Sequence, residues 1–175
     1  MIQKFLEQDS PMVAAVWLLL AFALTCMLLT KLSSFLPKDA GRAFAHDGSL
    51  SAGKPRGAGI IFVLVFIAAA ILFAPVSVET MIYLMLIAGE MLTGYMDDAA
   101  EHPWNEYKKG LLDLIIAIIL AVTYLNHNES SFTLATMGIT VTVPPVVFAV
   151  LTVILVWTSI NVTNCADGVD GLSGT

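Results

Sequence analysis

The sequence predicts an all-α fold, a polytopic bundle of helices that cross a membrane. Hydrophobic residues make up 58% of the 175-residue chain, and the mean hydropathy is +0.85. Charged residues make up only 13%, far below the roughly 25% of a soluble domain. Five apolar stretches come close to the roughly 20 residues that a helix needs to cross a bilayer. We therefore expect an integral membrane protein with a single membrane domain over residues 1–175.

The five expected transmembrane helices differ in how apolar they are. Three of them contain no charged residue, whereas the third carries Glu90 and the fourth carries Asp113. An ionisable side chain inside a bilayer usually faces other helices, so we expect these two residues to point away from lipid. The helices are expected at about residues 12–30, 58–78, 80–96, 110–125 and 143–160.

Basic residues predict the orientation of the chain, because short loops rich in Lys and Arg stay on the cytoplasmic side. Seven of the eight lie in the first and third loops, namely Lys31, Lys38, Arg42, Lys54, Arg56, Lys108 and Lys109. This asymmetry predicts an external N-terminus and five crossings. The first loop, the third loop and the end of the chain would then meet the cytosol together.

The acidic residues favour a binding site for a divalent cation over an anion-binding site made only of basic residues. The formal net charge is -6, and carboxylates are clustered among the basic residues of the predicted cytosolic segments. A cation such as Mg²⁺ can bridge such carboxylates to phosphate groups. The sequence has no basic stripe interleaved with aromatic residues, so we expect no nucleic-acid partner.

Two adjacent carboxylates, Asp97 and Asp98, stand where the third apolar stretch ends. Carboxylates at a helix C-terminus oppose the helix dipole, at a cost of about 0.3–1 kcal/mol each when exposed. An ordinary solvated helix end is one interpretation of this pair. The other is a functional pair, either two Mg²⁺ ligands or a base beside a ligand.

A polar motif follows the fifth apolar stretch, where Asn161, Asn164, Asp167 and Asp170 recur every third residue. That spacing does not keep all four side chains on one face of a straight helix. Gly168 and Gly171 allow the backbone to bend and to approach a ligand closely. The motif is either a polar cap without a ligand or a helix end that curls around a nucleotide.

Further basic residues are candidates for phosphate binding. Lys54 and Arg56 lie in a glycine- and proline-rich segment, residues 53–59, just before the second helix, where a helix N-terminus favours an anion. Anchoring on the cytoplasmic side explains the two residues equally well. Lys108 and Lys109 are likewise either interfacial anchors or phosphate contacts.

These elements resemble the polyprenyl-phosphate N-acetylhexosamine-1-phosphate transferases, the glycosyltransferase 4 family, and most closely its peptidoglycan branch. Three elements occur in the family's order: the segment 53–59, Gly94-Tyr95-Met96-Asp97-Asp98, and Asn161-x-x-Asn164-x-x-Asp167-Gly168-Val169-Asp170-Gly171-Leu172. The chain departs from the family where Lys54-Pro55-Arg56-Gly57-Ala58-Gly59 replaces the usual T-P-T-M-G-G. It also has Glu101 where a lysine is usual.

The resemblance implies a Mg²⁺-dependent transfer of phospho-N-acetylmuramoyl-pentapeptide from UDP to undecaprenyl phosphate at the cytosolic face of the bacterial plasma membrane. It makes Asp97 and Asp98 catalytic residues and metal ligands. It assigns substrate binding to Asn161, Asn164, Asp167, Asp170, Lys54, Arg56, Lys108 and Lys109. The expected partners are a UDP-linked amino sugar, undecaprenyl phosphate and membrane lipid. Whether the protein forms a homodimer is left open.

Two alternatives stay open. The sugar donor can instead be UDP-N-acetylglucosamine, with the same chemistry, or the chain can be a truncated, non-catalytic membrane protein. Family members have more membrane crossings than the five expected here. We therefore expect the sequence to be the N-terminal part of a longer transferase, or a truncated gene product, that is inactive by itself.

Labelling with a membrane-impermeant thiol reagent tests the topology. Cysteines introduced at Ser51 and at Ser130 are expected to react from opposite sides of the membrane, with Ser51 reacting from the cytosol, because the basic loops are retained there. Reaction of both positions from the same side would contradict the five-crossing arrangement.

Overall fold

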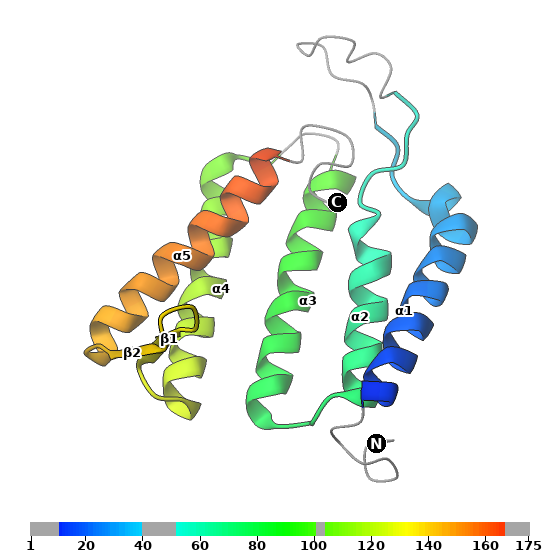
Figure 1. The fold of residues 1–175 in the computed structure, drawn as a ribbon. Helices are drawn as coiled ribbons and strands as arrows, with labels where there is room; N and C mark the ends of the chain where they lie inside the picture. Colours follow the sequence, from blue (N-terminus) through cyan, green and yellow to red (C-terminus); the bar gives the residue numbers. More distant parts are fainter. Residues whose placement is uncertain (1–10, 40–51, 101–103, 167–175) are drawn as a thin grey trace. The chain divides into compact units, whose positions relative to one another are not determined.

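A computed structural model describes residues 11–39, 52–100 and 104–166, which form five α-helices, one short 3-10 helix and one β-hairpin (Figure 1). This confirms the expected fold class, a helical membrane bundle. The elements are α1 Pro11–Leu32, η2 Ser33–Phe35, α2 Gly59–Phe73, α3 Val78–Ala99, α4 Glu106–His127, β1 Ser131–Leu134, β2 Ile139–Thr142 and α5 Pro145–Ala166.

The chain divides into two compact units, Met1–Trp104 and Asn105–Thr175. The first unit contains α1, α2 and α3, and the second contains α4, the hairpin and α5. A single membrane domain over the whole chain stays a prediction.

Three segments in the described part of the chain are long and apolar enough to cross a membrane: Ala14–Phe35, Glu106–His127 and Pro145–Asn164. Helix α3 is as long, at 22 residues, but it carries four acidic residues. Helix α2 has only 15 residues and spans about 22 Å at 1.5 Å per residue, against about 30 Å of hydrocarbon.

The predicted end of the second helix at residue 78 is wrong, because α2 ends at Phe73. The next residue, Ala74, has an extended backbone with φ -82° and ψ 153°. A proline disfavours helical geometry in the residue before it, and Pro75 follows here. Helix α3 then begins at Val78, where the Ser77 side chain caps the helix by accepting a hydrogen bond from the Thr80 N–H at 3.0 Å.

In the first unit, α1 and α2 run antiparallel. Trp17 near the start of α1 stacks on Phe73 at the end of α2, with ring centroids 6.5 Å apart. One face of α2 is buried through Ile61, Val65 and Ala69, which recur every fourth residue. The buried face of α2 is thus a single apolar stripe.

The two ends of the first loop pair with each other just before α2, and we call residues 37–39 and 53–56 the neck. The Asp39 N–H donates to the Lys54 carbonyl at 2.8 Å, and the Arg56 N–H donates to the Pro37 carbonyl at 2.7 Å. Lys38 and Pro55 form an antiparallel bridge between these bonds. The neck thereby fixes the backbone of Arg56 at the end of the unit where α2 begins.

Gly57, directly after the neck, allows the chain to approach α3 closely. Its φ is +67°, a conformation that L side chains rarely adopt. A Cβ atom there would lie 3.0 Å from Cδ2 of Tyr95 and 3.7 Å from Oδ2 of Asp98. In the structure this glycine accommodates α3, a packing role that the sequence pattern does not indicate.

In the second unit, α4 and α5 form an antiparallel pair joined by small residues. Ala117 and Ala121 on α4 are 0% and 1% exposed. Such residues let the backbones of membrane helices come close together. At the hairpin end, Tyr124 stacks on Phe148 with ring centroids 5.3 Å apart. At the other end, the Trp157 indole N–H donates to the Gly110 carbonyl at 2.8 Å.

The hairpin between α4 and α5 was not expected from the sequence. Its strands pair antiparallel, from Ser131 opposite Thr142 to Leu134 opposite Ile139. Gly138, which closes the turn, has φ +62°, as tight turns often require.

Alanine substitutions at two glycines test the close approach of the neck to α3. Gly57→Ala is expected to lower the free energy of unfolding of this chain by about 1–2 kcal/mol, because the new Cβ is strained by the positive φ and crowds Tyr95. The matched control is Gly94→Ala on α3, where nothing lies within 4 Å of the added atom. That change is expected to stabilise the helix by about 0.5–1 kcal/mol.

Thermal unfolding in detergent measures both variants. Gly53→Ala separates strain from crowding, since Gly53 has φ +83° but no atom within 4 Å of the new Cβ. Equal stability of the Gly57→Ala variant and the parent chain would show that the contact with Tyr95 is not formed.

Candidate active site

The polar end of the first unit brings the basic neck onto the carboxylates at the end of α3. Arg56 Nη2 lies 3.1 Å from Asp98 Oδ1, and the two side chains are 42% and 29% exposed. The guanidinium supplies positive charge where the C-terminus of α3 carries a partial negative charge. This ion pair offsets part of the repulsion that the sequence predicts for two acids at a helix end.

The second carboxylate of the pair is held by a different partner. Asp97 Oδ1 accepts a hydrogen bond from the Trp104 backbone N–H at 2.7 Å. The same bond ties the chain beyond α3 back to the helix end. Asp97 and Asp98 are thus fixed separately, one by a backbone donor and one by Arg56. No sequence pattern had pointed to Trp104 as a partner.

The carboxylate pair is chemically suited to Mg²⁺, which proteins often bind through one or two carboxylates together with substrate phosphates. Among the described residues, no group of three or more His, Cys, Asp or Glu side chains forms a metal site by itself. A cation bound by Asp97 and Asp98 would have coordination positions left for further ligands, such as the oxygens of a substrate phosphate. It would also compete with Arg56 for Asp98.

Lys108 and Lys109 lie in the first turn of α4 and not in the third loop, where the sequence predicts them. The helix begins earlier than expected because the Asn105 side chain caps it, accepting a hydrogen bond from the Tyr107 N–H at 3.1 Å. Lysines in the first turn oppose the helix dipole. Either interpretation of these lysines, interfacial anchor or phosphate contact, fits this position.

Asn161, the first residue of the polar motif, is held inside the second unit. Its Nδ2 donates to Asp113 Oδ2 at 3.3 Å and to the Trp157 carbonyl at 2.9 Å. Asp113 is only 7% exposed, which confirms that it faces a neighbouring helix. The sequence singled out both residues but gave no sign that they pair, because they stand 48 positions apart.

The rest of the motif begins at the end of α5. Asn164 is exposed in the last turn of the helix. Asp167 and Asp170 lie outside the described residues. Since α4 and α5 are antiparallel, Asn164 and the first-turn lysines of α4 belong to the same end of the second unit (Figure 1).

Comparison with known proteins places the same segments in an enzyme family. The family model for glycosyl transferase family 4 matches residues 80–175, which include the carboxylate pair, the lysines of α4 and the polar motif. No solved structure gives a significant match to the chain.

Three similar proteins are all named phospho-N-acetylmuramoyl-pentapeptide-transferase. The protein of Treponema pallidum is 41% identical over 172 residues, which cover 97% of this chain and 47% of the relative. The protein of Fervidobacterium nodosum is 30% identical over 173 residues, covering 92% of this chain and 53% of the relative. The protein of Symbiobacterium thermophilum is 31% identical over 136 residues, covering 70% and 40%.

The chain spans about half the length of these curated relatives. Its match to the family model nevertheless covers more than half of its own residues. Together with the helical membrane fold, this match shows that the chain belongs to glycosyl transferase family 4.

Proposed function

We propose that the protein containing this chain transfers phospho-N-acetylmuramoyl-pentapeptide from UDP to undecaprenyl phosphate, forming lipid I and UMP. The observation that carries the proposal is the 41% identity to a phospho-N-acetylmuramoyl-pentapeptide-transferase over 97% of the chain. The aligned region spans both the carboxylate pair and the start of the polar motif. The proposal concerns the whole protein, because this chain spans only about half the length of that relative.

In the proposed reaction, an oxygen of the lipid phosphate attacks the phosphorus that carries the sugar. A new P–O bond forms there, the bond between this phosphorus and the bridging oxygen of the diphosphate breaks, and that oxygen leaves as part of UMP. Bound Mg²⁺ would supply positive charge to offset the charge of both phosphates. Asp97 orients the attacking phosphate or takes its proton. Asp98 either assists Asp97 or would be a ligand of Mg²⁺.

The contacts of the carboxylate pair support this division of roles. The Asp97 carboxylate is positioned by a backbone donor, because its Oδ1 accepts a hydrogen bond from the Trp104 N–H at 2.7 Å. Asp98 instead sits against the Arg56 guanidinium at 3.1 Å. Arg56 is thereby placed where it can reach a phosphate that approaches Asp98, as expected of a phosphate-binding residue.

The polar motif is proposed to hold the nucleotide. Asn164, Asp167 and Asp170 offer amide and carboxylate groups suited to the uridine and ribose. Asn161 instead donates a hydrogen bond to Asp113 on α4. We propose that this bond holds the start of the motif in place on α5. Lys108 and Lys109, at the same end of the unit, would contact the diphosphate.

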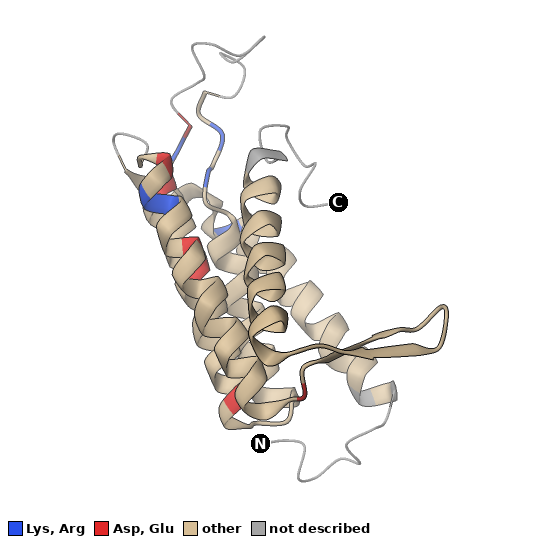
Figure 2. Cartoon of the chain, turned by 90° about the vertical axis from the view of Figure 1, so that its left-hand side faces the viewer, with Lys and Arg blue, Asp and Glu red and all other residues tan. Residues whose placement is uncertain are grey.

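We further propose that this chemistry takes place at the cytosolic face of the bacterial plasma membrane, with the N-terminus outside. In each unit the described Lys and Arg residues gather at one end of the helices (Figure 2). In the first unit this is the end that carries the neck and the carboxylates, and in the second it is the start of α4. Basic residues are retained on the cytosolic side.

The sugar donor is tested with the purified full-length protein in lipid vesicles. With undecaprenyl phosphate and Mg²⁺ present, UMP release is expected with UDP-N-acetylmuramoyl-pentapeptide and not with UDP-N-acetylglucosamine. The opposite preference would assign the protein to the second donor. UMP release without undecaprenyl phosphate would favour a route through a phosphorylated aspartate over direct attack.

Substitution of Asp97 separates chemistry from nucleotide binding in the same assay. Asp97→Asn is expected to lower turnover at least about tenfold, on the scale of a lost acid–base or metal contact. Its affinity for the UDP-sugar should stay unchanged, because the proposed nucleotide contacts lie in the polar motif.

Asp170→Ala is expected to weaken UDP-sugar binding about tenfold to a hundredfold, because Asp170 is proposed to contact the nucleotide and not the reacting phosphate.

The control is Glu129→Gln, which removes a carboxylate near the opposite end of α4 and should change neither quantity. Titration of the UDP-sugar measures the affinity, and UMP release measures the turnover. Normal turnover of the Asp97→Asn variant would remove this residue from the mechanism.

A further inference from the structure

The β-hairpin has two chemically distinct faces. Side chains alternate between the faces of a strand, and the register places Phe132 opposite Val141 and Leu134 opposite Ile139. We call these four residues the apolar face. The opposite face consists only of hydroxyl residues, in the pairs Ser131 with Thr142 and Thr133 with Thr140. Across that face, the Thr133 and Thr140 hydroxyl oxygens are 3.0 Å apart.

Three of the four residues of the apolar face are exposed, and the fourth, Val141, is half-buried. Phe132, Leu134 and Ile139 are 42%, 46% and 49% exposed. A two-stranded hairpin is marginally stable at best in water and needs something to cover its apolar side. Met137 in the turn is 71% exposed as well, so the apolar surface extends to the tip.

The position of the hairpin in the chain brings it to the edge of a membrane. It joins α4, which ends at His127, to α5, which begins at Pro145, and both helices are candidate membrane spans. Its base is closed by the Val143 N–H, which donates to the Ser130 carbonyl at 3.0 Å, and by the Ser130 hydroxyl, which donates to the Val143 carbonyl at 2.8 Å. The strands therefore start within a few residues of both helix ends.

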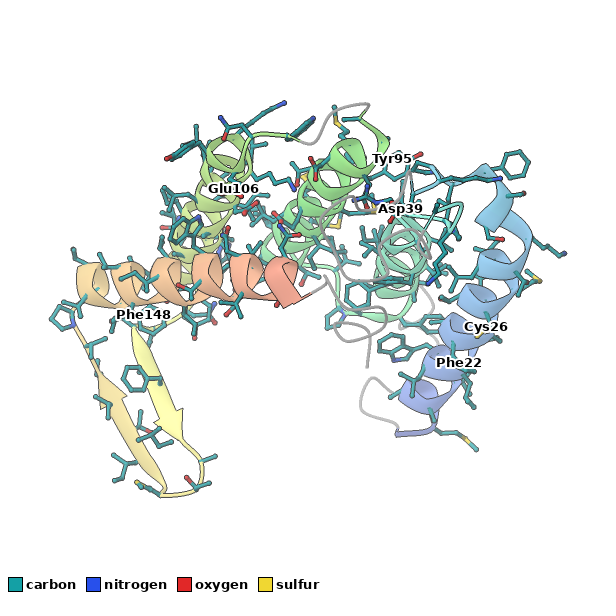
Figure 3. All side chains as sticks on the ribbon, turned by 90° about the horizontal axis from the view of Figure 1, so that it is seen from above. Phe22, Cys26, Asp39, Tyr95, Glu106 and Phe148 are labelled. Atoms are coloured by element: carbon teal, nitrogen blue, oxygen red, sulfur yellow. The ribbon has the colours of Figure 1, made fainter. Side chains whose placement is uncertain are left out.

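The hairpin points across the axis of α5 and does not continue along it, which is the direction expected of an element that lies on a membrane surface. In two perpendicular views it projects sideways across the axis of α5, away from the start of that helix near Phe148 (Figures 2 and 3). The sequence from residue 130 to residue 166 contains no Lys, Arg, Asp or Glu. No charge therefore opposes contact between this segment and lipid.

We propose that the hairpin lies in the membrane interface, with the apolar face against lipid acyl chains and the hydroxyl face toward water. Its partner is the bilayer itself. Amphipathic elements at an interface bury their apolar side about 5–10 Å deep in the headgroup and acyl boundary. The hairpin then holds the ends of α4 and α5 at a fixed depth, whichever side of the membrane they occupy.

The bilayer is a better occupant than a second protein surface, because the apolar face is continuous with the lipid-facing helices at its base. Exposed apolar residues of α5, such as Val146 and Val150, begin directly after the hairpin. A hairpin that lies across the helix axis at the start of α5 is therefore next to the lipid that contacts this helix.

Spin labels on neighbouring residues test the proposal in the full-length protein. Single cysteines are placed at Phe132 and Thr133, and independently at Ile139 and Thr140, after Cys26, Cys165 and any further native cysteines have been replaced. The labelled protein is reconstituted in vesicles of phosphatidylcholine and phosphatidylglycerol. Collision with oxygen reports exposure to lipid, and collision with a water-soluble nickel chelate reports exposure to water.

The ratio of oxygen to nickel accessibility is expected to be at least about threefold higher at Phe132 than at Thr133, and likewise higher at Ile139 than at Thr140. The second pair keeps the test informative if a label at Phe132 disturbs the first strand. Equal ratios on the two faces would overturn the proposal. So would low accessibility of the apolar face to both reagents, which would indicate that a protein surface covers it.

Discussion

The ion pair between Arg56 and Asp98 is the contact on which the polar end of the first unit depends. Two adjacent carboxylates at the C-terminus of α3 repel each other and the helix dipole, so the site needs positive charge from elsewhere. The neck brings Arg56 to that point, 3.1 Å from Asp98, and Gly57 allows the following chain to pass close to Tyr95. The Trp104 N–H then fixes Asp97.

In the second unit, too, a carboxylate needs a polar partner, here between the two apolar helices α4 and α5. A carboxylate in a membrane helix is costly unless it finds a partner. Asp113 is 7% exposed and accepts a hydrogen bond from Asn161, while the Trp157 indole bonds to the Gly110 carbonyl one turn earlier on α4. These polar contacts lie toward the end of the unit where the polar motif starts. Packing and proposed function therefore depend on the same few residues.

The sequence predicted the fold class and the approximate positions of five helices, because long apolar stretches carry a strong signal. It missed local effects, namely the early end of α2 before Pro75 and the early start of α4 at the Asn105 cap. It also missed the hairpin, whose uncharged strands of four residues are too short for a clear periodic pattern. The pairing of Arg56 with Asp98 depends on the path of the neck, which no local pattern reveals.

A double-mutant cycle on Arg56 and Asp98 tests most directly whether the neck holds the Asp98 carboxylate at the end of α3. Thermal unfolding in detergent would be measured for the parent chain, Arg56→Gln, Asp98→Asn and the double variant. If Arg56 and Asp98 form the ion pair, the coupling free energy is expected to be about 0.5–1 kcal/mol, the upper part of the range for partly exposed ion pairs. Additive effects of the two substitutions, with no coupling, would contradict it.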